Sequence, residues 1–517
     1  VMALPGNILL ITADQWRGDC LSILGHPAVR TPNIDALAAD GVLFERHYCQ
    51  AAPCSPARAS LYTGLYQMNH RVCRNGSPLD ARFTNIAQEG RRAGYGPVLL
   101  GYTDQTLDPR TRHPKDPRLT TYEEVLPGFE RHTRYDEHAL DWLHWLEGKG
   151  EDASGGLNGV YGSVPQDGPF SRADLTPKFA SEHTETGYIT ERFLDYLGQQ
   201  DADKPWFAHL SFIRPHPPFS VPEPYNSMID DALVPEPSRA ASVEAEAAQH
   251  PFLRFMLDRV PSKSFVPGGG DRLVTDWSDE EVRAVRAIYF AMVAEVDAQL
   301  GRLVDGLKEA GAYEDTLIVL TSDHAEMLGD HHLFGKLGYF EQSYHIPLII
   351  RMPGAHNPRG VRVGRFTESI DIAPTLAEWS GIPTPLQYDG RSLLPFLEGK
   401  EPSTWRDAAH WEFDFRDVTG GVPERELGLR LDQCQLAVRR EGRFKYVHFA
   451  ALPPLLFDLE NDPDELVNLS GNPDYAAEEL AAARGMLSWR QAMSERTLNG
   501  IDVTTDGPVE RSFAERF

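Results

Sequence analysis

The chain has 517 residues, of which 41% are hydrophobic and 10% aromatic, and this composition excludes an intrinsically disordered protein. A formal net charge of -26, from 76 acidic and 50 basic residues, argues against binding to nucleic acid or to an anionic membrane. Five irregularly spaced cysteines without a CxxC pair argue against a zinc knuckle or a disulfide framework. With no basic leader and no apolar run of about 18 residues, we expect a cytoplasmic protein.

Four short apolar segments, each followed by polar residues, predict strands of a parallel sheet. They are residues 7–12, 97–100, 206–212 and 317–321. Leucine and β-branched runs of this length are typical of strands that are buried on both faces. Helical patterns lie between them, the clearest over residues 279–308, and this alternation predicts an α/β fold.

The polar residues after these strands are candidates for one site, because ligands of such sheets bind beyond the carboxyl ends of the strands. The candidates at the strand ends are Asp14, Gln15, Tyr102, Asp104, His216, Asp323 and His324. Two carboxylates with an imidazole suit a divalent metal ion, and one imidazole favours Mn²⁺ or Zn²⁺ over Ca²⁺. Gln15 could be a direct ligand, or it could hold Asp14 in place.

Composition divides the chain into a large and a small part. Residues 1–390 are predicted to form a large α/β domain, with a central mostly parallel sheet flanked by helices. Strand-like runs and a helical pattern at 476–493 predict a smaller α+β domain over residues 391–498. The tail, residues 499–517, has little core, so we expect it to pack on a neighbouring subunit or to fray.

Two long segments, residues 105–180 and 215–278, are irregular and rich in Pro, Gly, Asp and His. Irregular segments of this length in a compact domain are usually lids or subunit contacts. Together with the tail, they lead us to expect a homo-oligomer.

Residues 54–64 carry the strongest local motif, C-S-P-A-R-A-S-L-Y-T-G, which fits C-x-P-x-R-x-x-L-x-T-G. Taken alone, Cys54 could be a thiolate nucleophile near Arg58 or an inert buried thiol. With this motif the chain resembles the sulfatase family of the alkaline phosphatase superfamily, whose C-x-P-x-R signature marks a cysteine that is oxidised to formylglycine. Residues 322–336 look like the family's second metal-ligand segment, and residues 456–469 look like its C-terminal segment.

The resemblance implies a fold, a cofactor set and a reaction. It implies an alkaline-phosphatase-like domain and a hydrolase of small anionic esters that needs a formylglycine-generating enzyme. The formylglycine from Cys54 would act as a geminal-diol nucleophile on one divalent metal ion, with Mn²⁺ expected and Ca²⁺, Mg²⁺ or Zn²⁺ as alternatives. The implied metal ligands are Asp14, Cys54, Asp323 and His324.

Further site residues have roles that the resemblance implies and plainer alternatives. Arg58 would activate the nucleophile together with the metal, and Lys336 and His216 would stabilise the transferred group. A protonated His216 would also donate to the leaving oxygen. Lys336 could instead be a surface lysine. The residues that would bind substrate are Asn75, Tyr102, Asp104 and Gln15, of which Asn75 and Tyr102 could equally be structural.

The segment after the second predicted strand departs from many arylsulfatases, which carry a G-K-x-H type segment there. This chain has Gly-Tyr-Thr-Asp at residues 101–104, and Asp14-Gln15 replaces the paired aspartates of the family. Both features resemble the phosphonate monoester hydrolase branch, although Asp104 stands where that branch tends to place a hydroxyl residue. The choice between sulfate and phosphonate esters therefore stays open.

Three functions are compatible with these residues. The first is a hydrolase of sulfate or phosphonate esters that uses formylglycine, either an arylsulfatase-type enzyme or a phosphonate monoester hydrolase. The second is a phosphatase or phosphodiesterase of the same superfamily that uses an unmodified residue. The third is a catalytically inactive binding protein on the same scaffold, against which the complete set of candidate residues argues.

Overall fold

The structure is a computed structural model that describes residues 4–166, 168–354 and 357–510. At its centre lies an eight-stranded sheet in the order β5-β4-β6-β1-β7-β8-β2-β9. The strands are β1 (Asn7–Ala13), β2 (Val42–Tyr48), β4 (Val98–Gly101), β5 (Glu130–Arg134), β6 (Phe207–Phe212), β7 (Thr316–Thr321), β8 (Leu348–Arg351) and β9 (Val361–Glu368). Strand β8 is antiparallel to β7 and β2, and the other neighbours in this sheet are parallel. The predicted α/β class is confirmed.

The four predicted strands are neighbours at the centre of this sheet. They correspond to β4, β6, β1 and β7, which follow one another in the strand order. In register, Ile8 pairs with Phe207 on one side and with Leu317 on the other. Because all four strands are parallel, their carboxyl ends share one edge, and the residues that follow them are brought together there.

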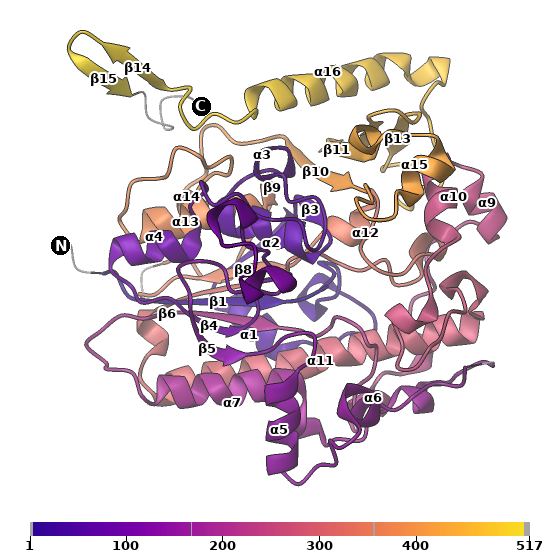
Figure 1. The fold of residues 1–517 in the computed structure, drawn as a ribbon, viewed down its shortest axis with the longest axis horizontal. Coiled ribbons are helices and arrows are strands. Elements are labelled where there is room, and N and C mark those ends of the chain that lie inside the picture. Colours follow the sequence, from indigo (N-terminus) through magenta and orange to yellow (C-terminus); the bar gives the residue numbers. More distant parts are fainter. Residues whose placement is uncertain (1–3, 167, 355–356, 511–517) are drawn as a thin grey trace.

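Helices cover both faces of the central sheet (Figure 1). On one face lie α1 (Pro32–Ala39), α7 (Glu185–Leu197) and α11 (Asp279–Glu309), and on the other lie α2 (Cys54–Thr63), α4 (Ile86–Ala93) and α13 (Ile372–Trp379). The predicted helix at 279–308 is confirmed as α11. Its start is fixed by Ser278, whose hydroxyl accepts from the Glu281 N–H while the Glu281 carboxylate accepts from the Ser278 N–H.

A second sheet of five strands lies beside the first. Its order is β13 (Leu455–Asp458), β12 (Phe444–Phe449), β11 (Gln435–Glu441), β10 (Ala408–Asp414) and β3 (Ala51–Ala52). Helix α16 (Ala476–Ala492) packs on β11 and β12. Strand β3 lies two residues before Cys54 and pairs with β10, so the smaller sheet anchors the backbone that leads into the nucleophile motif. The predicted limits of the small domain, residues 391–498, stay a prediction.

Shorter elements fill the remaining chain. They are α3 (Gln67–His70), α5 (Leu140–Gly148), α6 (Gly156–Tyr161), α8 (Tyr225–Met228), α9 (Val243–Ala247), α10 (Pro251–Leu257), α12 (Glu341–Tyr344), α14 (Leu394–Leu397), α15 (Val422–Leu427), β14 (Ile501–Thr504) and β15 (Gly507–Glu510). In Figure 1 the β14–β15 hairpin extends beyond the body of the molecule. Within the described ranges, no helix has both the length and the apolar character that crossing a membrane requires. The cytoplasmic location stays a prediction.

Glu295 on α11 is a buried acid whose side chain accepts a hydrogen bond from the Thr184 hydroxyl (2.6 Å). Burial raises the pKa of Glu295 to about 7, against the opposing charge of Arg214. In the unfolded chain this carboxyl loses its proton near its ordinary pKa, so the folded protein loses stability as pH rises from about 4 to about 7. From pH 5 to pH 7 the wild type loses stability through this group, whereas Glu295→Gln does not. We therefore expect the unfolding free energy of Glu295→Gln, relative to that of the wild type, to be about 2 kcal/mol higher at pH 7 than at pH 5.

Urea unfolding at the two pH values measures this gain, with Glu130→Gln as the control, because Glu130 is exposed on β5. Wild-type and Glu295→Gln stabilities that change in parallel between pH 5 and pH 7 would contradict the interpretation.

Candidate active site

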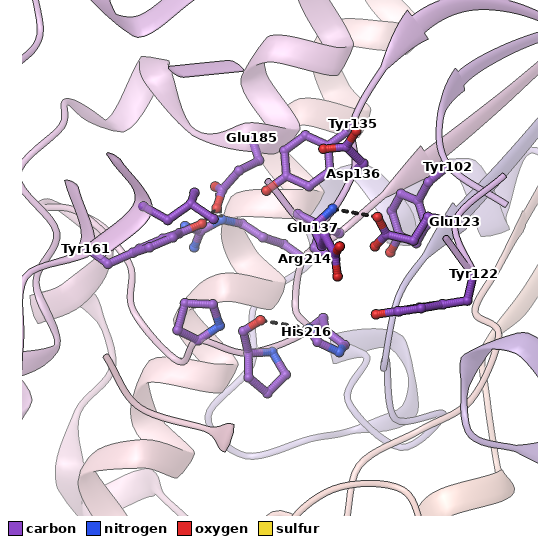
Figure 2. Close-up of a pocket in the computed structure, with 14 residues that line it drawn as sticks. Tyr102, Tyr122, Glu123, Tyr135, Asp136, Glu137, Tyr161, Glu185, Arg214 and His216 are labelled. Atoms are coloured by element: carbon purple, nitrogen blue, oxygen red, sulfur yellow. Dashed lines mark hydrogen bonds and ion pairs between the residues drawn. The ribbon is translucent and has the colours of Figure 1, made fainter. Parts of the chain in front are cut away.

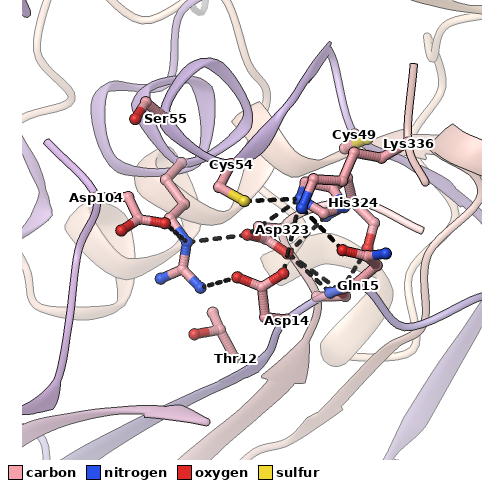
Figure 3. A network of polar contacts seen from close by, with 12 residues as sticks. Thr12, Asp14, Gln15, Cys49, Cys54, Ser55, Asp104, Asp323, His324 and Lys336 are labelled. Atoms are coloured by element: carbon pink, nitrogen blue, oxygen red, sulfur yellow. Dashed lines mark hydrogen bonds and ion pairs between the residues drawn. The ribbon is translucent and has the colours of Figure 1, made fainter. Parts of the chain in front are cut away.

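The four predicted metal ligands meet beyond the carboxyl ends of the central strands. Asp14 follows β1, Asp323 and His324 follow β7, and Cys54 is the first residue of α2. One ligand atom from each lies within 4.8 Å of the others, and all four residues are buried. His324 Nε2 lies 3.2 Å from Cys54 Sγ and 3.7 Å from Asp14 Oδ1 (Figure 3).

This cluster fits a single divalent cation. Asp14 Oδ1 is buried and has no hydrogen-bond partner in the described part of the chain. A buried carboxylate oxygen without a partner is rare in proteins, and a bound cation would satisfy it. Two carboxylates and one imidazole are ligands that Mn²⁺ and Mg²⁺ accept, and a fourth position is available from residue 54.

Arg58 lies one helical turn after Cys54 on α2 and is fully buried. Its Nε donates to Asp323 Oδ2 (2.9 Å), and its Nη2 donates to Asp14 Oδ2 (3.1 Å). Its Nη1 donates to the hydroxyl of Ser211 (2.8 Å) at the end of β6. Arg58 therefore holds both candidate metal carboxylates and balances their charge beside the nucleophile position.

Gln15 connects the metal cluster to Lys336. The Lys336 ammonium donates to Gln15 Oε1 (2.8 Å), and the backbone N–H of Gln15 donates to Asp323 Oδ1 (3.2 Å). The amide nitrogen of Gln15 donates to Glu326, which also accepts from the backbone N–H of Gly335 (2.6 Å). In this arrangement the amide oxygen of Gln15 faces Lys336, which favours the interpretation that Gln15 positions its neighbours.

Gly101 and Tyr102 shape the end of β4. Gly101 has a φ of +116°, and a Cβ there would lie 2.4 Å from the carbonyl oxygen of Ser211, so this close approach of β4 to β6 requires glycine. The Tyr102 hydroxyl donates to Asp14 Oδ2 (2.7 Å), and its ring lies 4.3 Å from the guanidinium of Arg58. Tyr102 thus ties the end of β4 to the candidate metal ligand Asp14 and to Arg58.

Asp104 and Asn75 lie beside the start of α2. Asp104 is buried with a left-handed φ of +50°, and its Oδ2 is 3.8 Å from Arg58 Nε. Burial raises the pKa of Asp104 well above its ordinary range, although Arg58 opposes the shift. The Asn75 side-chain oxygen accepts from the backbone N–H of Ser55 (3.0 Å), so it fixes the first turn of α2. That Asp104 and Asn75 bind substrate stays a prediction.

Lys336 and His216 differ in charge at neutral pH. Burial alone would lower the pKa of Lys336, but negatively charged neighbours, among them Asp14 and Asp323, raise it overall, so Lys336 stays protonated. Burial, and then the charge of Lys336, lower the pKa of His216 to about 3. His216 is therefore neutral in the free protein, with its Nδ1 2.7 Å from the carbonyl oxygen of Pro217. Its predicted role as a proton donor requires a bound anion that raises this pKa.

The sequence of this chain matches two protein-family models. A family model described as Sulfatase matches residues 6–382, and one described as N-sulphoglucosamine sulphohydrolase, C-terminal matches residues 329–487. The chain belongs to the sulfatase family. The resemblance drawn from the cysteine motif is confirmed, and this sulfatase-family protein is an ester hydrolase in class.

Individual relatives of this sulfatase-family chain cover nearly all of it. It is 54% identical to the phosphonate monoester hydrolase of Agrobacterium radiobacter, whose crystal structure superposes with a TM-score of 0.94 over 98% of this chain and 99% of that one. It is 42% identical over 512 residues to the multifunctional alkaline phosphatase superfamily protein PehA of Trinickia caryophylli, covering 98% of this chain and 99% of that protein. An arylsulfatase of Clostridium perfringens is 28% identical over 496 residues, with 91% of each chain covered.

Most residues that the sequence nominated lie together in this sulfatase-family protein, and two were missed. Glu326 lies within the segment 322–336, for which only the metal ligands were predicted, yet it joins Gln15 to the loop that carries Lys336. Ser211 was within a predicted strand, and its hydroxyl holds Arg58. Its position at the carboxyl end of β6 was the signal that could have nominated it.

Proposed function

We propose that this protein is a metal-dependent hydrolase that cleaves phosphonate monoesters and, more slowly, sulfate esters. In this proposal a formylglycine-generating enzyme oxidises Cys54, and the modified residue is the nucleophile. The observation that carries the proposal is the buried cluster in which Asp14, Asp323 and His324 surround Cys54 while Arg58 holds both carboxylates. The activity named for the 54% identical relative, a phosphonate monoester hydrolase, supports the same class of substrate.

Without a bound cation, the side chains around an unmodified Cys54 do not favour a thiolate nucleophile. Burial, followed by the charges of Asp14 and Asp323, raises the pKa of its thiol, and Lys336 opposes this only in part. The surrounding side chains therefore favour the neutral thiol and do not prepare a thiolate. A hydrated formylglycine would place a hydroxyl at the same position, and its second hydroxyl would allow release of the bound group without attack by water.

A bound divalent cation would be held by Asp14, Asp323, His324 and residue 54, and we propose Mn²⁺, with Mg²⁺, Ca²⁺ and Zn²⁺ as the alternatives to compare. It would supply Lewis-acid stabilisation of negative charge on oxygen.

The chain's own groups would act around the bound ester. The protonated Lys336 would bind an oxygen of the transferred group. Arg58 would keep the two carboxylates oriented. Neutral His216 would gain a proton only when the ester is bound and would then donate to the leaving oxygen.

A paired kinetic assay tests the proposed substrate preference. Protein loaded with Mn²⁺ is given an aryl phosphonate monoester and an aryl sulfate with the same leaving group. We expect the larger kcat/KM for the phosphonate, because Tyr102 occupies the segment that supplies a lysine and a histidine in many arylsulfatases and is tied to Asp14. A larger kcat/KM for the sulfate would contradict the preference but not the ester hydrolase class.

We also propose that the protein is a homo-oligomer in which the β14–β15 hairpin contacts another subunit. The hairpin strands pair only with each other among the described residues, and Val503 and Val509 on them are 86% and 57% exposed. Exposed valines on a projecting hairpin are typical of a subunit contact. A chain that ends at Asn499 is expected to have a smaller mass by size exclusion with light scattering, and an unchanged assembly would contradict this.

A further inference from the structure

A cavity of about 210 Å³ opens directly beside the candidate active site (Figure 2). Tyr102 and His216 belong to both, since they line the cavity and stand at the ends of β4 and β6. The other walls come mainly from the two irregular segments, residues 105–180 and 215–278, and from α7. Because His216, the proposed proton donor to the leaving oxygen, lines this cavity, the leaving group of a bound ester would lie in it.

Aromatic rings form much of the cavity wall. The tyrosines that line it are Tyr102, Tyr122, Tyr135 and Tyr161. In Figure 2, Tyr161 and Tyr122 lie on opposite sides, with Tyr135 and Tyr102 toward the top and His216 below. Tyr135 is buried, and its hydroxyl, which Figure 2 shows turned toward the space between these side chains, donates to no group among the described residues. The wall thus combines aromatic rings with a tyrosine hydroxyl that has no hydrogen-bond partner among the described residues.

The one arginine among the lining residues cannot serve as an anion site. Arg214 Nε donates to Glu185 Oε2 (2.7 Å), and Arg214 Nη1 donates to the carbonyl oxygen of Ser220 (2.7 Å). Arg214 and Glu185 are both buried, and the Tyr161 hydroxyl donates to the same carboxylate. This ion pair is neutral as a unit, so Arg214 adds no net positive charge to the cavity.

The remaining charged groups of the wall are acids. Glu123 is half-buried and accepts from the backbone N–H of Glu137 (2.7 Å), but no lysine, arginine or histidine of the described chain lies within ion-pair distance of it. Asp136 is paired with Arg134, and Glu137 lies 3.5 Å from the exposed His138. Burial, with some contribution from Glu137 and Asp136, raises the pKa of Glu123 to about 7, as expected for a carboxyl that lacks a counter-charge.

We propose that this cavity binds the leaving-group half of the ester and selects leaving alcohols that carry a positive charge, such as an ammonium or quaternary ammonium on an aryl or short alkyl group. The inference rests on the proposed function and specifies its substrate class. Tyrosine rings attract cations through their faces, and a cation beside Glu123 would favour the charged form of that carboxyl. The preferred substrate is therefore dipolar, with its anionic group facing Lys336 and its cationic group facing Tyr122 and Glu123.

Two aryl phosphonate monoesters of nearly equal shape test this selection. One has a para-trimethylammonium group on the leaving phenol, and the other has a para-tert-butyl group. We measure the ratio of their kcat/KM values in wild type and in Glu123→Gln, because the intrinsic difference between the two phenols cancels in that comparison. We expect Glu123→Gln to lower the ratio about tenfold, the size of one partly buried charge contact.

Glu130→Gln is the matched control. Glu130 is an exposed glutamate on β5 that does not line the cavity. We therefore expect the ratio of the two kcat/KM values in Glu130→Gln to equal that of wild type. A ratio in Glu123→Gln that equals wild type would overturn the proposal.

Binding of the free alcohols to the wild-type protein gives a second test that needs neither a variant nor hydrolysis. Calorimetry compares 4-hydroxyphenyltrimethylammonium with 4-tert-butylphenol, and we expect at least about tenfold tighter binding of the cation. Equal or weaker binding of the cation would overturn the inference. If neither ester is hydrolysed, the proposed function fails while this comparison still decides the character of the cavity.

Discussion

Replacement of Cys54 with alanine is expected to lower kcat for both phosphonate and sulfate esters by about 10⁴-fold or more, because it removes the reacting atom. The cluster around position 54 offers no substitute nucleophile, since Asp14 and Asp323 are held by Arg58 and His324 faces the same cluster. Steady-state kinetics with both esters measures the effect. Cys434→Ala is the control, because Cys434 is also a buried free thiol but lies at the start of the second sheet.

The serine variant separates the two chemical interpretations of this residue. Serine supplies one hydroxyl and could form a covalent ester with the transferred group, but it lacks the second hydroxyl that would release it. We therefore expect Cys54→Ser to show at most a single turnover. Full multiple-turnover activity of Cys54→Ser would contradict the formylglycine proposal and favour a superfamily phosphatase that uses an ordinary residue.

Asp323→Asn is expected to abolish tight metal binding and to lower kcat/KM by about 10³-fold or more. The substitution removes one of two candidate carboxylate ligands and leaves the buried Arg58 with Asp14 at 3.1 Å and Asp104 at 3.8 Å. Metal content by elemental analysis and thermal unfolding with and without Mn²⁺ provide readouts besides activity. At a metal concentration 100 times Kd, the wild type should gain about 2.7 kcal/mol, and the variant should gain much less.

Asp305→Asn is the control for this experiment, because Asp305 is exposed near the carboxyl end of α11 and is not part of the cluster. If Asp323→Asn bound Mn²⁺ with the stoichiometry and stabilisation of the wild type, the assignment of the metal ligands would be wrong.

The sequence predicted the central strands that carry the site, because their local apolar runs agree with their burial in the folded sheet. Strands β4, β6, β1 and β7 are continuous apolar runs that stay buried on both faces, so hydrophobicity alone reveals them. Strand β9 escaped prediction because exposed Arg362 and Arg365 interrupt its apolar pattern. Strand β3 has two residues and pairs with β10 more than 350 positions later, so no local signal marks it.

The sequence could indicate which residues are candidates for the site, but not the protonation states and the cavity that surround them. Each candidate ligand lies within three residues of the end of a strand or begins a helix, and this is a local property. The pKa of His216, by contrast, depends on burial and on Lys336, which lies 120 positions away in the sequence. The cavity is likewise assembled from separate segments that include Tyr122, Glu123 and Arg214. Chemistry that depends on such distant neighbours appears only once the chain is folded.

The most direct test is the mass of the peptide that contains Cys54. The protein is coproduced with a formylglycine-generating enzyme, and the peptide is measured in preparations that hydrolyse a phosphonate monoester. We expect the thiol of Cys54 to be replaced by an aldehyde or its hydrate. We also expect kcat to rise in proportion to the converted fraction of Cys54 across preparations. A peptide that carries only cysteine in a fully active preparation would contradict this expectation.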